Sequence, residues 1–153
     1  MHPLLNYIKA SPAGYQAMLA LQGAVQKNGL EPLLMELVKI RASQINKCAF
    51  CLHMHTKDAR KLGEREERIY LLSAWRESSL YTPRERAALA WTEALTLIAE
   101  HGAPEDVYQA ASAEFSPAEL TDLTLAIVAI NGWNRIAIGF ALPHPVAAKT
   151  GTT

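Results

Sequence analysis

Helix start signals recur along this sequence, whereas strand signals are scarce. The tetrapeptides TPRE at residues 82–85 and SPAE at residues 116–119 each place a hydroxyl residue before a proline, with a glutamate three positions after the hydroxyl. This is the pattern of a capping box, in which both side chains satisfy the first backbone N–H groups of a helix, and proline is preferred at the first helical position. No alternating polar and apolar run is bounded by hairpin turn residues. The pattern therefore predicts an all-α fold.

The same signals divide the chain into about six to seven helices. Pro12 and Pro32 are expected to open the first two, and Asn28, Gly29, Gly63 and Gly102 to stop helices. The expected segments span residues 11–27, 32–45, 48–62, 65–77, 82–101, 104–113 and 116–140. The last segment is apolar nearly all round, which is typical of a central helix or of one buried at a subunit contact.

The length of 153 residues fits one domain, and no linker interrupts the pattern. We assign residues 1–142 to this domain. Residues 143–153 contain prolines followed by small and polar residues that bury little surface, so we expect a frayed C-terminal tail.

Fifteen basic side chains balance fifteen acidic ones, which gives no global field for nucleic acid or for anionic lipid. The chain starts without a basic segment leading into an apolar stretch, and it has no run of about 18 apolar residues. We therefore expect a cytoplasmic protein without a nucleic-acid or membrane partner. In that compartment the two cysteines start reduced, and a close pair is more typical of catalysis, redox sensing or metal binding than of a structural disulfide.

Both cysteines lie in one short stretch, INKCAFCLHMHTKDAR, at residues 45–60. On a helix, Cys48, Cys51 and His55 stand at i, i+3 and i+7, so their side chains fall within roughly 60° of one another. The two thiols are then close enough to approach disulfide geometry near the frayed start of the helix. The spacing indicates thiol redox chemistry.

Two features favour a thiolate here, and they favour different cysteines. A free thiol with a pKa of about 8.5 is mostly protonated at neutral pH. His55 is one turn beyond Cys51 and is placed to take its proton, whereas Cys48, in the first turn, experiences the positive end of the helix dipole. From the residues alone, either thiol is a candidate nucleophile.

Metal and haem sites fit this stretch less well. Zinc would use Cys48, Cys51, His55 and His53, but His53 is about 200° around the helix from its neighbours, and no second Cys pair closes a structural site. Leu52 follows Cys51, whereas covalent haem attachment requires a histidine there. A thioredoxin-type motif belongs beside a βαβ pattern that this chain lacks. The remaining alternative is that the two thiols are buried together by coincidence and have no catalytic role. We expect neither a bound metal nor a cofactor.

Glu36, Cys48, Cys51 and His55 together resemble the core motif of the alkylhydroperoxidase D-like group within the carboxymuconolactone decarboxylase superfamily. The resemblance covers about residues 30–140 and includes the sequences LSAWRES and AINGWNR. It implies an all-helical fold that assembles as trimers or hexamers, and a peroxidase cycle without haem, flavin or metal. It also implies that Cys51 attacks the peroxide, that Cys48 resolves the product, and that His55 and Glu36 relay protons. The implied partners are a hydroperoxide substrate and an external dithiol or protein reductant.

Other interpretations stay open at this stage. Glu36 is alternatively a solvated partner of Lys39, and His53 and Asp58 are expected to be solvated. Arg135 in an otherwise apolar helix needs a partner, for which Glu36 or a neighbouring subunit is a candidate. The chain is alternatively a disulfide-exchange or redox-sensing protein, a decarboxylase or lactonase whose pocket merely contains the cysteines, or a purely structural oligomer.

Overall fold

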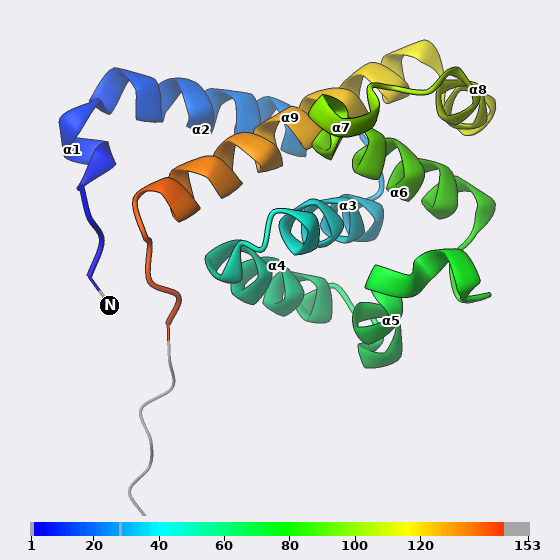
Figure 1. The fold of residues 1–153 in the computed structure, drawn as a ribbon, viewed down its shortest axis with the longest axis horizontal. Helices are drawn as coiled ribbons and strands as arrows, with labels where there is room; N and C mark the ends of the chain where they lie inside the picture. Colours follow the sequence, from blue (N-terminus) through cyan, green and yellow to red (C-terminus); the bar gives the residue numbers. More distant parts are fainter. Residues whose placement is uncertain (1, 28, 146–153) are drawn as a thin grey trace, which may run out of the picture.

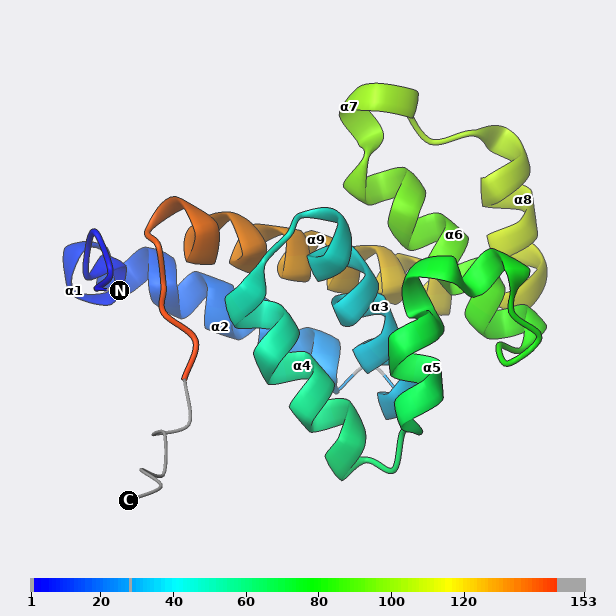
Figure 2. The same ribbon diagram turned by 60° about the horizontal axis from the view of Figure 1, so that its bottom comes forward.

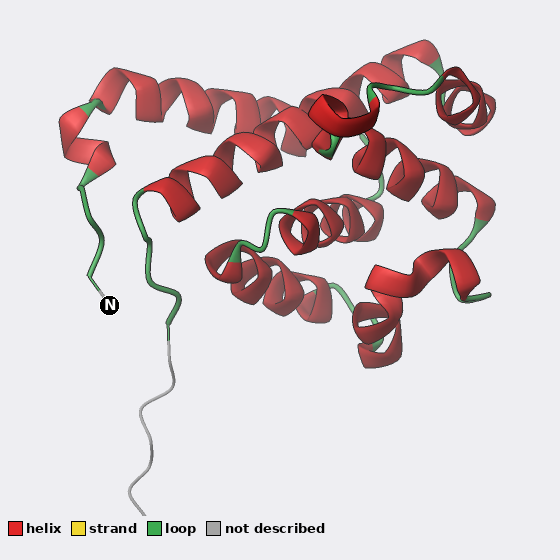
Figure 3. Ribbon diagram, viewed as in Figure 1, coloured by secondary structure: helices red, strands yellow, loops and turns green. Residues whose placement is uncertain are grey.

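The structure, a computed structural model, describes residues 2–27 and 29–145. All regular structure in these ranges is helical, as predicted (Figure 3). The helices are α1 (Tyr7–Ala10), α2 (Pro12–Gln26), α3 (Pro32–Ile45), α4 (Ala49–Lys61), α5 (Glu66–Leu71), the 3-10 helix η1 (Leu72–Glu77), α6 (Pro83–Thr96), α7 (Ile98–His101), α8 (Glu105–Glu114) and α9 (Pro117–Gly139). The described ranges thus hold nine α-helices in a single domain, and the prediction of six to seven was too low.

The additional helices are short, and they arise from one local cap and from breaks within longer expected segments. The side chain of Asn6 accepts a hydrogen bond from the backbone of Lys9 and caps the single turn of α1. The segment expected at 82–101 breaks at Leu97, next to Thr96, whose hydroxyl accepts a hydrogen bond from Asn131 in α9. The segment at 65–77 changes from α-helix to 3-10 helix at Leu72. The contact with α9 is tertiary, so it is invisible to a local pattern.

Both predicted capping boxes are present. The backbone N–H of Glu85 donates to the Thr82 hydroxyl at 3.2 Å, and the Thr82 N–H donates to the Glu85 carboxylate at 2.8 Å. Ser116 and Glu119 make the same pair of bonds at 3.3 and 2.8 Å. These two boxes fix where α6 and α9 begin.

Helix α3 lies at the centre of the fold and contacts α4, α6, α9 and η1 (Figure 1). Its fully buried side chains include Leu37, Val38 and Ile40. The long α9 lies beside α2 in both views (Figures 1 and 2). Helix α4 therefore packs against the middle of the molecule, with α3 and α9 as its neighbours.

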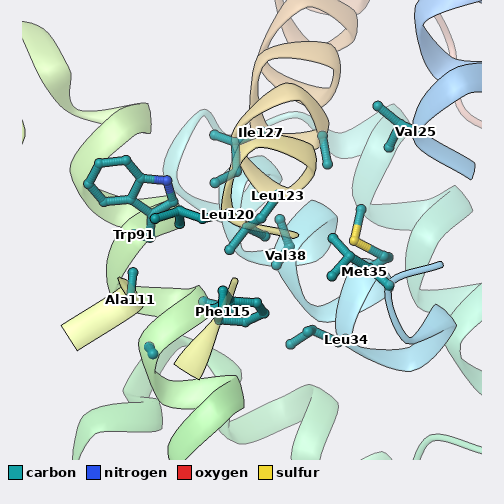
Figure 4. Packing of buried hydrophobic residues seen from close by; sticks show 14 residues of the cluster. Val25, Leu34, Met35, Val38, Trp91, Ala111, Phe115, Leu120, Leu123 and Ile127 are labelled. Atoms are coloured by element: carbon teal, nitrogen blue, oxygen red, sulfur yellow. The ribbon is translucent and has the colours of Figure 1, made fainter. Parts of the chain in front are cut away.

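The largest apolar cluster joins α3, α6, α8 and the first half of α9. Figure 4 shows Met35 and Val38 of α3 close to Leu123 of α9, with Phe115 and Trp91 completing the cluster. This cluster anchors α3 and α9 at one end, so that their other ends frame the cysteines.

Parts of the sequence predictions lie outside the described residues. Helix α2, the first of the expected helices, ends at Gln26, but the expected stop at Asn28 is outside the described residues. Residues 143–145 follow the last helix without regular structure, and residues 146–153 of the expected tail lie outside the described residues. Within residues 2–27 and 29–145, none of the helices combines the length and the apolar character that a bilayer span requires.

Candidate functional site

Cys48 is the N-cap of α4 and does not belong to its first turn. The chain ends α3 at Ile45 and turns through Lys47, which has the left-handed φ of 58°. The Cys48 sulfur then accepts a hydrogen bond from the backbone N–H of Cys51 at 3.4 Å, and the two sulfur atoms lie 2.7 Å apart. Each cysteine is only 1% exposed. The predicted approach of the two thiols at the start of the helix is therefore present, with the helix beginning one residue later than expected.

The two thiols differ in charge. The hydrogen bond from Cys51 lowers the pKa of Cys48 to about 7, and backbone N–H groups and the Asn134 side chain add to this effect against the opposing effect of burial. The same hydrogen bond, followed by burial, raises the pKa of Cys51. Cys48 therefore ionises first, and its negative charge lies at the positive end of α4. Cys51 keeps its proton and donates it to the Cys48 thiolate in a hydrogen bond.

Glu36 and His55 are in direct contact. The carboxylate Oε2 of Glu36 lies 2.9 Å from His55 Nδ1, and its Oε1 accepts a hydrogen bond from Lys39 Nζ at 2.7 Å. Burial raises the pKa of Glu36, but the hydrogen bond with His55 and the charge of Lys39 outweigh it, so that this pKa is lowered. The carboxylate therefore stays ionised at neutral pH. Glu36 binds Lys39 and His55 at once, but it is only 7% exposed, so the interpretation as a solvated side chain was wrong.

The ionised carboxylate also sets the tautomer of His55. A carboxylate only accepts hydrogen bonds, so His55 Nδ1 carries a proton and, in the neutral ring, Nε2 is the acceptor. Among the described residues, no hydrogen bond joins His55 to either sulfur. His55 is buried on the same face of α4 as Cys51.

A cavity of about 270 Å³ brings these groups together, with Cys51, His55, Glu36 and Lys39 in one wall. The opposite walls come from α2 and α9 and are mostly apolar. The aromatic lining residues are Tyr7, Tyr15, Phe50 and Trp133. Cys51 lines this cavity, whereas Cys48 is not one of its lining residues. A small, largely apolar molecule in this space would meet the sulfur of Cys51 first.

Asn134 belongs to this site although the sequence interpretation gave it no role. It is fully buried, and hydrogen bonds connect it to Asn46 and to Ser43 just before Cys48. The expected pairing of the neighbouring Arg135 with Glu36 was wrong, because Arg135 is exposed and binds Asn131 of its own helix, whereas a partner in a neighbouring subunit stays a prediction. The available signal was the pair of amides, Asn131 and Asn134, in an otherwise mostly apolar stretch.

The remaining predicted positions lie at the edge of the site. His53 is exposed, as predicted, and its ring stacks on His144 at 5.5 Å. Asp58 lines the cavity and binds Lys61 at 2.9 Å. Over residues 2–27 and 29–145, no three His, Cys, Asp or Glu side chains are arranged to hold a metal ion. That geometry gives no support to the zinc alternative.

Comparison with known proteins identifies the family of this chain. Residues 12–94 match the model of the carboxymuconolactone decarboxylase family. The YdfG protein of Bacillus subtilis is 41% identical over 149 residues, which cover 97% of this chain and all of that protein.

Solved structures extend the likeness to three dimensions. ATU0492 of Agrobacterium tumefaciens, a protein of unknown function named as a candidate antioxidant defence protein AhpD, is 51% identical with a TM-score of 0.91, over 95% of this chain and 99% of its own. A peroxidase-related protein of Silicibacter is 25% identical with a TM-score of 0.76, over 96% of this chain and 78% of its own. The shared helical fold and the match over more than half of the sequence show that this chain belongs to the carboxymuconolactone decarboxylase family, as an AhpD-like member.

Proposed function

We propose that this protein is a cysteine-dependent peroxidase that reduces organic hydroperoxides through a Cys48–Cys51 dithiol and disulfide cycle. One observation carries the proposal: two buried sulfurs lie 2.7 Å apart, and the sulfur of Cys51 lines an apolar cavity beside the His55–Glu36 pair. A covalent S–S bond is about 2.05 Å long, so only a small movement separates the pair from a disulfide. The name of the ATU0492 protein supports the same chemistry.

Cys51 is the proposed nucleophile because it is the sulfur that a molecule in the cavity reaches. Its proton passes to the neighbouring Cys48 thiolate, which leaves Cys51 ionised. The Cys51 thiolate attacks the terminal oxygen of the hydroperoxide, the O–O bond breaks, and the products are a Cys51 sulfenic acid and an alkoxide. The alkoxide takes a proton that the His55–Glu36 pair relays from solvent, which yields an alcohol.

Cys48 then completes the cycle. Its thiol condenses with the sulfenic acid of Cys51, so that an S–S bond forms and one water molecule leaves. The protein loses two electrons, and the hydroperoxide gains them as it becomes an alcohol and water. An external dithiol reduces the disulfide by exchange and becomes a disulfide itself. No step needs a bound cofactor.

Intact mass spectrometry of the reduced protein tests this cycle directly. One equivalent of cumene hydroperoxide is expected to remove two hydrogen atoms from each chain, and dithiothreitol in excess is expected to sustain turnover. Cys51→Ser abolishes peroxide consumption, whereas Cys48→Ser stops at a sulfenic acid on Cys51 that dimedone traps. Peroxide turnover by Cys51→Ser contradicts the assignment of the nucleophile.

Two histidines of α4 provide a matched pair of variants. His55→Ala removes the proposed proton relay and is expected to lower turnover about 10²-fold, the scale of one general acid–base group. His53→Ala removes the same side chain at an exposed position outside the cavity and is expected to leave turnover unchanged. Equal losses in the two variants would indicate that the relay is not at His55.

The rival functions give different results in the same experiments. A disulfide-exchange protein is oxidised by small disulfides but does not turn over peroxide with a dithiol. A decarboxylase or lactonase keeps its activity after both thiols are alkylated. A structural oligomer shows neither oxidation nor turnover.

A further inference from the structure

Asn134 stands where α9 faces the two cysteines. Ile130 and Ala137, one turn before and one turn after it, pack in one apolar cluster with Cys48 and Cys51. Positions 130, 134 and 137 form one stripe of a helix, so Asn134 lies between the two residues that contact the cysteines. It is 0% exposed. A fully buried amide at this place is costly unless each of its polar groups has a partner.

Two neighbours hold the Asn134 side chain in one orientation. Its Oδ1 accepts a hydrogen bond from Asn46 Nδ2 at 2.8 Å, and its Nδ2 donates to the Ser43 hydroxyl at 3.0 Å. The same Asn46 group also donates to Asn131 Oδ1 at 2.9 Å. A flip of the amide would set its Nδ2 against the Asn46 donor and lose that bond, so the Asn46 contact fixes the orientation. One N–H of the amide is left for a further acceptor.

The two sulfurs are candidate acceptors for this N–H, since Cys48 and Cys51 lie in one cluster with the residues on either side of Asn134 in the helix. Hydrogen bonding by the Asn134 side chain lowers the pKa of Cys48, in the same direction as the larger effect of the hydrogen bond between the two sulfurs. It also acts to lower the pKa of Cys51, although the net shift of that pKa is upward. A hydrogen bond to a charged group is stronger than one to a neutral group, so this N–H favours the ionised pair. In the disulfide the sulfurs carry no charge, and the bond weakens.

We propose that Asn134 is a positioning residue for the dithiol: its side-chain N–H, aimed by Asn46 and Ser43, stabilises the negative charge that the two sulfurs share. The reduced pair is thereby favoured over the disulfide, which makes the protein a stronger oxidant of its reductant. As a contribution to catalysis this inference rests on the proposed peroxidase cycle, whereas as a property of the dithiol it is independent of that cycle.

The test compares Asn134→Leu with the wild type by following the ultraviolet absorbance of the thiolate against pH. The expected result is a rise in the thiolate midpoint of about one pH unit, the scale of one hydrogen bond to a charged group. At a pH where Cys48 is ionised, equilibration with dithiothreitol is expected to favour the disulfide about tenfold more in the variant. Neither measurement needs peroxidase activity.

Asn131→Leu is the matched control. It makes the same substitution one turn earlier in α9 and breaks the outer end of the network, but it leaves the bonds of Asn134 to Asn46 and Ser43 in place. Its thiolate midpoint is expected to equal that of the wild type. A folded Asn134→Leu with an unchanged midpoint overturns the proposal, as does an equal shift in Asn131→Leu.

NMR of the wild type supplies a test if Asn134→Leu does not fold. The side-chain amide protons of Asn134 are expected to titrate with the thiolate midpoint and to shift again on oxidation to the disulfide. Asn134 signals that respond to neither change overturn the proposal. A protein that shows both responses yet turns over no peroxide refutes the proposed function and leaves this inference standing.

Discussion

The substitution Glu36→Gln tests the electrostatics of the site, because it changes the charge of one buried side chain and keeps its shape. The carboxylate accepts from Lys39 at 2.7 Å and from His55 at 2.9 Å, and Glu36 is 7% exposed. A glutamine carries no charge and has only one acceptor oxygen; a neutral His55 can move its proton to Nε2 and accept from the amide, whereas Lys39 can only donate. Both bonds of the carboxylate are then replaced by weaker bonds between or to neutral groups, and Lys39 is left as a largely buried cation without its counter-charge.

The expected loss of stability follows from these contacts. Hydrogen bonds to charged groups contribute about 1.5–3 kcal/mol, and an uncompensated buried charge adds to the cost, so we expect Glu36→Gln to lower the free energy of unfolding by about 3 kcal/mol. In a domain of this size that corresponds to a fall in Tm of roughly 6–12 °C. Chemical denaturation followed by circular dichroism measures it, and Lys39→Met is the matched control, since Glu36 keeps its bond to His55 there.

The double variant Glu36→Gln, Lys39→Met isolates the pair. Because it removes the stranded cation, it is expected to be more stable by at least about 1 kcal/mol than the sum of the two single losses implies.

The loss of stability in Glu36→Gln also depends on pH. The pKa of Glu36 is lower in the folded state than its ordinary value of 4.5, which applies to the unfolded chain. The ionised Glu36 therefore stabilises the fold fully above pH 4.5, and this stabilisation disappears as the pH falls through the pKa of the folded state. A Glu36→Gln protein as stable as the wild type at pH 7, or a stability difference that grows in acid, would refute the reasoning.

Three further predictions concern other parts of the molecule. Ultraviolet titration of the reduced protein is expected to show one thiolate per chain appearing at about pH 7, because Cys48 ionises first and Cys51 keeps its proton; two thiolates at that midpoint would contradict the shared proton. Ser116→Ala removes one capping box and is expected to cost about 1 kcal/mol in a denaturant titration, with no change in the thiolate midpoint. Leu37→Ala empties a fully buried position and is expected to cost about 2–5 kcal/mol, measured in the same way; a cost below 1 kcal/mol would show that α3 is not central.

Sequence signals predicted the helices where the signal is local. The capping boxes at Thr82 and Ser116 depend only on residues within one turn, and both lie where they were expected. The break at Leu97 was missed because it lies next to the contact between Thr96 and Asn131, residues 35 positions apart in the sequence. Such contacts depend on how the helices pack against one another, so the spacing of residues along a single helix does not predict them.

The candidate site divides in the same way. Cys48, Cys51 and His55 are close in sequence, so their proximity followed from helical spacing, and the resemblance to a family added Glu36. Asn134 could not be found by spacing, because its partners Asn46 and Ser43 lie 88 and 91 residues earlier in the sequence. The sequence shows an amide that departs from the apolar pattern of its helix, but it does not show which residues the amide binds. Those partners are known only once the packing of the helices is known.

The N-cap position of Cys48 reconciles the two opposing expectations about the nucleophile. Inside the helix, residues at i and i+3 have their Cβ atoms about 5–6 Å apart, and Cys48 would not accept from the first free N–H groups. At the N-cap its sulfur accepts from the backbone of Cys51 and lies against the other sulfur, so charge gathers on Cys48 while Cys51 lines the cavity. Cys48 therefore has two proposed tasks: it takes the proton of Cys51 before the attack, and it forms the disulfide afterwards. It follows that Cys48→Ser, which keeps a hydroxyl but loses this base, should slow the first oxidation of Cys51 as well as prevent the disulfide, whereas a cysteine needed only for the second task would leave that first oxidation at its normal rate.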